Sequence, residues 1–82
     1  MPHTDYADPE TVFPRLEARV QKVEDDAYWI TIWHWKELGV RERVFNRKQA
    51  GSYEDAKETI VKHARELGAI VEPDDITVDH VE

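Results

Sequence analysis

The sequence predicts a small α+β domain: a four-stranded, largely antiparallel sheet, ordered β-β-β-α-β along the chain, with one helix packed on one face. Two observations predict this fold. Residues 27–35 are rich in aromatic and β-branched side chains and contain neither Gly nor Pro, which is typical of a strand. Residues 52–68 repeat apolar side chains every three or four positions between a Ser and a Gly, which is typical of a capped helix.

The length of 82 residues fits one domain. We expect a flexible acidic N-terminal tail over residues 1–12, because it holds two prolines and three acids, and a single domain over residues 13–82. The chain has no cysteine, which excludes disulfides and thiolate metal sites. No apolar run approaches the roughly 20 residues of a membrane span, so we expect a soluble, intracellular protein of the cytoplasm with no membrane partner.

The first segment of the domain, residues 15–23, fits two patterns. Leu16, Ala18 and Val20 alternate as in a strand, whereas Leu16, Val20 and Val23 fit the stripe of a helix. We favour a strand because residues 24–27 form a tight connection to the strong strand that follows. The alternative makes residues 9–24 a helix and the order α-β-β-α-β.

The next two strands form a predicted hairpin. Gly39 suits a left-handed position in a three-residue loop, Glu37–Gly39, after which residues 40–47 form the third strand. Lys36 then faces Val40. Counting outward predicts these further pairs: Trp35 with Arg41, His34 with Glu42, Trp33 with Arg43, Ile32 with Val44, Thr31 with Phe45, and Trp29 with Arg47.

The helix begins after Ser52 with a capping-box pattern, in which Asp55 is the third helical residue. Gly68 is a natural end. Its apolar stripe consists of Tyr53, Ala56, Ile60, Ala64 and Leu67. Residues 76–81 alternate as a final strand.

Strand 27–35 is apolar on both sides, although one helix is available to cover one face. Tyr28, Ile30, Ile32 and Val44 suit the helix side. The other side collects aromatic and arginine residues: Trp29, Trp33, Trp35, Arg41, Arg43, Phe45 and Arg47. We favour a register in which Leu16, Ala18 and Val20 join the isoleucines. A slip of one residue instead packs Leu16, Ala18 and Val20 against the tryptophans, which then become core. In a further alternative the N-terminal segment covers Trp29 and Trp33 through Val12 and Phe13.

These seven residues are the predicted binding site, because Trp and Arg are enriched at interaction hot spots. We expect a non-enzymatic protein-interaction domain whose partner is another protein or a second copy in a homodimer. One alternative is a single-stranded nucleic-acid-binding module on the same face, since bases stack on aromatic rings. Another is an acidic inhibitor that blocks a basic nucleic-acid-binding groove.

Charge is unevenly distributed in this chain of net charge −7. Residues 1–14 carry −3, residues 15–48 carry +2 and residues 49–82 carry −6. The middle third is therefore mildly basic within an acidic protein. Such acidity argues against duplex DNA as a partner, because duplex binding depends on clustered Lys and Arg.

Catalytic and metal-binding signals are weak, so we expect no enzymatic activity and no cofactor. Ser52, the single serine, is already assigned to the helix cap. No carboxylate lies within an apolar run that would perturb it. His34, His63 and His80 form a weak candidate zinc cluster, because all three could lean into the layer between sheet and helix.

Overall fold

The computed structural model describes residues 12–80, apart from the side chain of His80. It contains β1 (Arg15–Glu24), β2 (Ala27–Glu37), β3 (Val40–Ala50), α1 (Tyr53–Leu67), the 3-10 turn η1 (Pro73–Asp75) and β4 (Ile76–His80). The order β-β-β-α-β is confirmed, and β1 shows that the helical alternative for residues 9–24 is wrong over its described part. Of the predicted tail, residues 1–11 lie outside the described residues.

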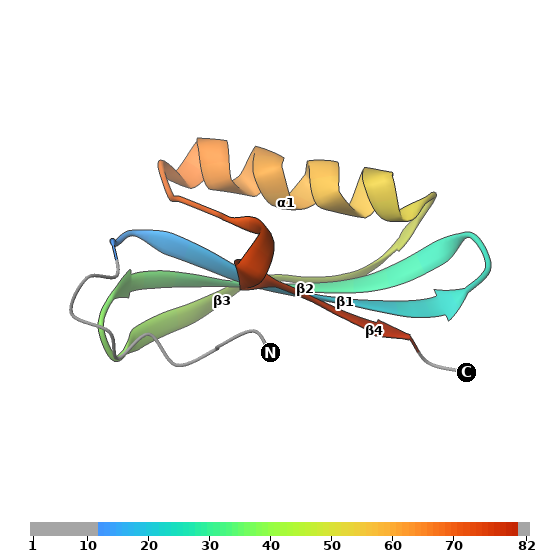
Figure 1. The fold of residues 1–82 in the computed structure, drawn as a ribbon, viewed down its shortest axis with the longest axis horizontal. Helices are drawn as coiled ribbons and strands as arrows, with labels where there is room; N and C mark the ends of the chain where they lie inside the picture. Colours follow the sequence, from blue (N-terminus) through green and yellow to red (C-terminus); the bar gives the residue numbers. More distant parts are fainter. Residues whose placement is uncertain (1–11, 81–82) are drawn as a thin grey trace.

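The four strands form one sheet in the order β3-β2-β1-β4. β1, β2 and β3 are antiparallel neighbours, whereas β4 lies parallel to β1. The chain leaves β3 at one edge, crosses one face of the sheet as α1, and returns as β4 at the opposite edge (Figure 1). A single helix therefore covers one face of a mixed, mostly antiparallel sheet, as predicted.

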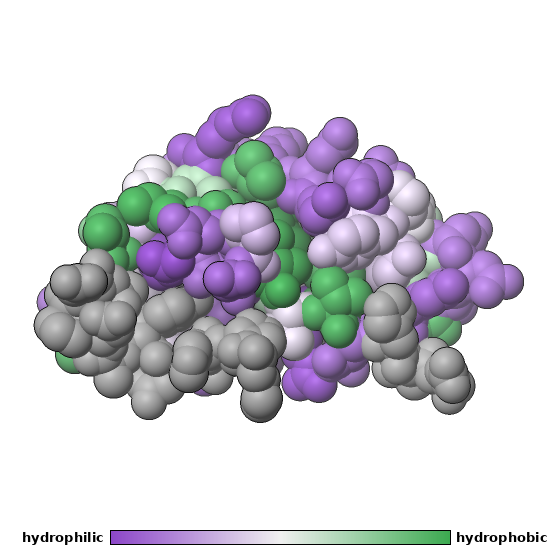
Figure 2. Space-filling view, in the orientation of Figure 1, coloured by the Kyte–Doolittle hydropathy of each residue, from purple (hydrophilic) through white to green (hydrophobic). Residues whose placement is uncertain are grey.

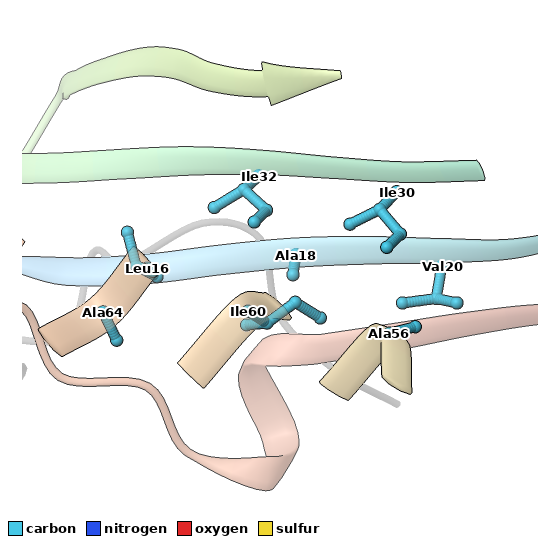
Figure 3. Close-up of a cluster of buried hydrophobic side chains, with 8 residues drawn as sticks. All are labelled: Leu16, Ala18, Val20, Ile30, Ile32, Ala56, Ile60 and Ala64. Atoms are coloured by element: carbon cyan, nitrogen blue, oxygen red, sulfur yellow. The ribbon is translucent and has the colours of Figure 1, made fainter. Parts of the chain in front are cut away.

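The core lies between α1 and the sheet and is entirely aliphatic at its centre. The register places Leu16, Ala18 and Val20 of β1 on the face that also carries Ile30 and Ile32 of β2, which confirms the favoured register. The fully buried cluster consists of Leu16, Ala18, Val20, Ile30, Ile32, Ala56, Ile60 and Ala64 (Figure 3). Small alanines on β1 and α1 allow the helix to lie close to the strands.

The helix begins and ends as its sequence predicts. The amide of Asp55 donates to Ser52 Oγ at 3.3 Å, and the amide of Ser52 donates to Asp55 Oδ2 at 2.8 Å, which completes the capping box. Gly68 has a φ of 64°, and its amide donates to the carbonyls of Ala64 and Arg65. Leu67, predicted as part of the apolar stripe, is instead an exposed residue of the last turn.

A β-bulge at Val44 overturns part of the predicted register. Trp33 pairs with Arg43 and His34 with Glu42, as expected, but Ile32 then pairs with Phe45 because Val44 is an extra residue. Beyond the bulge, every β3 residue lies opposite a β2 residue one place later in the sequence than predicted, and its side chain changes face. The predictions that Thr31 faces Phe45, Ile32 faces Val44 and Trp29 faces Arg47 are therefore wrong.

A second irregularity lies at the hairpin turn. Glu37, rather than Lys36, is opposite Val40, so Lys36 is the extra residue and the turn itself is Leu38–Gly39. Gly39 has a φ of 79°, as a left-handed turn position requires. Trp35 nevertheless faces Arg41, as predicted, because the extra residue Lys36 compensates for the turn being one residue shorter than predicted.

Candidate functional site

The sheet face opposite α1 is built from alternate residues of all four strands, and we call it the Trp face. It comprises Arg15, Glu17, Arg19 and Gln21 of β1; Trp29, Thr31, Trp33 and Trp35 of β2; Arg41, Arg43, Asn46 and Lys48 of β3; and Thr77 and Asp79 of β4. Five of the seven predicted site residues share it: Trp29, Trp33, Trp35, Arg41 and Arg43. Strand alternation brings them together, since residues two apart point to the same side.

Phe45 and Arg47 lie on the other face, which corrects their assignment to the site. Phe45 packs against the helix-side core, with its ring edge-on to that of His63 at a centroid distance of 4.8 Å. The guanidinium of Arg47 lies 5.8 Å from the Phe45 ring centroid. After the bulge, Asn46 and Lys48 occupy the positions predicted for these two residues.

One end of the Trp face, which we call the inner half, consists of Glu17, Trp35 and Arg41. These residues form a polar network that is largely buried. The Trp35 residue is 8% exposed, and its indole Nε1 donates to Glu17 Oε1 at 2.9 Å. Glu17 itself is 3% exposed, and the same oxygen accepts from Arg41 Nη1 at 3.3 Å. Because a buried carboxylate needs partners, Trp35 and Arg41 stabilise Glu17, and Glu17 in turn orients both side chains.

Arg41 links the inner half to the neighbouring tryptophan. Its guanidinium carbon lies 5.1 Å from the Trp33 ring centroid and 5.5 Å from that of Trp35, within the range of a cation–π contact. The same guanidinium thus lies near two indoles and pairs with Glu17. One head group therefore connects Trp33, Trp35 and the buried carboxylate.

The other end, which we call the outer half, consists of Trp29, Thr31, Trp33, Arg43 and Asn46. Trp29 is 36% exposed, and its indole Nε1 donates to Asn46 Oδ1 at 2.6 Å. The hydroxyl of Thr31 donates to the same oxygen at 3.1 Å. One carboxamide thus fixes the Trp29 ring, although this ring faces solvent.

Most cations of the Trp face are already neutralised by carboxylates of the chain. Arg15 pairs with Asp75 and Glu72, each at 3.0 Å, and Arg19 pairs with Asp79. Similar pairs join Arg41 to Glu17 and Lys48 to Glu24. Within residues 12–80, Arg43 is the cation of this face that takes part in no ion pair. The outer half therefore presents one guanidinium whose charge is uncompensated.

Sequence reasoning did not single out several residues of the site, among them Glu17, Thr31, Asn46 and Lys48. Alternation assigned Glu17 to this face, but no sequence signal marked it as buried. Asn46 reaches the face only because Val44 forms a bulge. Nothing in the pattern of residues 40–47, which alternates acceptably in either register, predicts that bulge.

The candidate zinc cluster is not formed by this topology. His34 lies opposite Leu16, whereas His80 lies opposite Lys22, six residues further along β1. At about 3.3 Å per residue these positions are roughly 20 Å apart, too far to share an ion. His63 uses Nδ1 to donate to the carbonyl of Thr59 at 2.9 Å. Among the side chains of residues 12–79, no three potential ligands cluster.

The comparisons with known proteins leave the site to be interpreted from its geometry. In the part of the chain that the structure describes, α1 is neither long nor apolar enough to cross a membrane. No protein-family model, no curated protein and no solved structure matches the chain.

Proposed function

We propose that the chain is a non-enzymatic protein-interaction domain, and that the outer half of its Trp face is the binding surface. The observation that carries this proposal is an exposed, hydrogen-bonded Trp29 on the same face as Trp33 and the unpaired Arg43. Trp and Arg dominate the energetics of protein interfaces, and exposed aromatic patches commonly mark them.

The order of these side chains before binding supports the proposal. The Asn46 carboxamide holds Trp29, and the Arg41 guanidinium lies over Trp33. Fixing a side chain on association costs about 0.5–1.5 kcal/mol, and a ring that is already fixed avoids most of this cost. The outer half can therefore bind with little loss of entropy.

The charges of the face define the chemistry of the partner. An apolar side chain of the partner would pack on the two indoles, and a carboxylate would pair with Arg43. The remaining cations have carboxylate partners within the chain, so a highly acidic partner would gain little from them. The surface suits a mixed apolar and acidic patch on another protein.

The same pairing disfavours the two alternatives from the sequence. A single-stranded nucleic acid could stack on Trp29 and Trp33, but the backbone phosphates would find Arg43 alone unpaired on this face within residues 12–80. An acidic inhibitor would lose three of its carboxylates, since Glu72, Asp75 and Asp79 are held by arginines of β1, although exposed acids such as Glu58, Glu66 and Asp74 are left to it. These alternatives remain outcomes of the test.

The experiment compares Trp29→Ala with Leu38→Ala in affinity capture from a nuclease-treated native extract, followed by titration of the captured protein. Leu38 is an exposed apolar residue at the hairpin turn, away from the outer half, and serves as the matched control. We expect a protein whose affinity falls by about tenfold or more in Trp29→Ala and is unchanged in Leu38→Ala.

A titration of tryptophan fluorescence with a short single-stranded oligonucleotide separates the alternatives. Salt-sensitive quenching by the oligonucleotide, with no nuclease-resistant protein partner, would replace the proposal with nucleic-acid binding. Equal affinity of both variants for a captured protein would move the binding surface away from the outer half.

A further inference from the structure

The two edges of the sheet differ in how they are protected against pairing with another strand. β3 carries the bulge at Val44 and several charged side chains, namely Arg41, Glu42, Arg43, Arg47 and Lys48. Bulges and charges are the usual devices that prevent edge-to-edge association. The main-chain groups on the outer side of β3 are therefore poor templates for an additional strand.

β4 has no bulge, and its single carboxylate is that of Asp79. Its sequence is Ile-Thr-Val-Asp-His, its pairing with β1 is regular, and it has no proline. The carboxylate of Asp79 is paired with Arg19, so the edge presents little net charge there. As the last strand in the sheet order, β4 has no neighbour on its outer side among the described strands.

Apolar side chains flank this edge. Ile70 forms a parallel bridge with Arg15 on the same side of β1 as β4, and it is 40% exposed. Val61 is 38% exposed and points away from β3, because its neighbours Thr59 and His63 contact β3 residues. Figure 2 shows apolar patches on this side of the molecule, below the charged residues of α1 and interrupted by hydrophilic ones.

We propose that β4 is the interface of a two-fold homodimer, in which it pairs antiparallel with β4 of a second copy. The two sheets then form one continuous sheet of eight strands, twice the four of one chain. This surface is separate from the outer half of the Trp face. Pairing would satisfy the outward main-chain groups of β4 and cover some of the apolar surface at this edge.

The side chains of β4 favour a second copy in one register. With the two-fold axis at Val78, Val78 faces its own copy and Thr77 faces Asp79, so no two carboxylates are opposed. A shift to an axis at Asp79 would place Asp79 opposite its own copy, and directly opposed like charges are destabilising. In the register with its axis at Val78, Ile76 and Val78 of both copies lie on the helix side of the joined sheet, and the two Val78 side chains are neighbours.

This arrangement has a consequence for binding. A two-fold axis perpendicular to the sheet leaves both α1 helices on one face and both Trp faces on the other. The dimer would present two outer halves on one side of a single sheet. Two linked sites bind a repeated or dimeric partner more tightly than either site alone.

Sedimentation equilibrium of the full chain tests the dimer, at concentrations from about 1 μM to about 500 μM. We expect the mass to rise from the 9.6 kDa of one chain toward twice that value. Val78→Lys places a charge on the two-fold axis, and should weaken dimerisation by about tenfold or more. Val40→Lys, at the β3 edge, is the matched control and should leave the dimer unchanged.

Hydrogen exchange of the unaltered chain supplies a readout that needs no variant. The outward amides of β4 should exchange more slowly at high concentration than at low concentration, while those of the β3 edge should not change. A mass of one chain throughout the range overturns the proposal. So does a dimer that survives Val78→Lys but is lost in Trp33→Ala, which would place self-association on the Trp face instead.

Discussion

Trp35 and Trp29 lie on the same face of the same strand, yet one residue is 8% exposed and the other 36%. Their cross-strand neighbours differ as well. Trp35 lies opposite Arg15 and Arg41, and its indole nitrogen reaches the buried Glu17. Trp29 lies opposite Gln21 and Lys48 and is held from one side by Asn46. Identical residue types in one alternating pattern thus acquire different environments from their cross-strand partners.

The comparison separates stability from binding on a single face. The inner half uses its tryptophan as part of the interior, so changes there should unfold the protein. The outer half keeps its tryptophan ordered at the surface, so changes there should spare the fold. Substitutions at matched positions in the two halves test this division.

Trp35→Ala should have the largest effect on stability. It removes a large buried ring and leaves the Glu17 carboxylate without its indole donor, so we expect a loss of about 3–5 kcal/mol in the free energy of unfolding. Chemical denaturation followed by circular dichroism measures this loss. Trp29→Ala is the comparison and should cost less than half as much; equal losses would show that both tryptophans are core.

Glu17→Ala should have an intermediate effect. It leaves the Trp35 indole nitrogen unpaired in the interior and frees the Arg41 guanidinium, and we expect a loss of about 1–3 kcal/mol in the free energy of unfolding. Glu17→Gln should lose less, because a carboxamide oxygen can still accept from Trp35. Glu42→Ala removes an exposed carboxylate 3.5 Å from Lys36 Nζ, and this control should change stability by less than about 0.5 kcal/mol.

Equal losses for Glu17→Ala and Glu42→Ala would contradict the view that the inner half is a buried network. A loss of stability for Glu17→Gln as large as that for Glu17→Ala would instead assign the stabilisation to the ion pair between Glu17 and Arg41, because the hydrogen bond from Trp35 is kept in Glu17→Gln. The three variants therefore apportion the network between its two contacts.

The fold was predictable where the signal is local. Alternation in β1 and β2 predicted which face each side chain takes, and the Ser52 and Asp55 pattern predicted the start of α1. Both depend on residues a few positions apart, so neither needs the tertiary structure. The confirmed order of elements follows from the same local rules.

The site was predictable only in part, because two of its determinants are not local. The bulge at Val44 moves Phe45 to the helix side, where it packs against His63 of α1. A hydrophobic residue gains more from that packing than from the open face, but the sequence of β3 alone does not express this preference. The acceptor for the Trp35 indole is likewise Glu17, which lies 18 residues away.

Asn46→Ala should have the smallest effect on stability and the most specific effect on the outer half. The lost hydrogen bonds join exposed groups that water can satisfy, so we expect a cost of no more than about 1 kcal/mol. The Trp29 ring loses its single described hydrogen-bond acceptor, and the order parameter of its indole N–H should fall from near 0.85, typical of a rigid group, toward about 0.6. Nitrogen-15 relaxation of the three tryptophan indole groups measures this change.

Asn46→Asp is the matched control, since a carboxylate oxygen can accept from both Trp29 and Thr31 and should keep the ring ordered. The indole of Trp35 provides an internal reference, because Glu17 holds it in every variant. If the Trp29 indole in Asn46→Ala stays as rigid as that of Trp35, the Asn46 carboxamide does not organise the outer half. Affinity for a protein partner should then be unaffected by the loss of Asn46, and the rigidity of the surface would have to come from packing between the indoles and their strand neighbours.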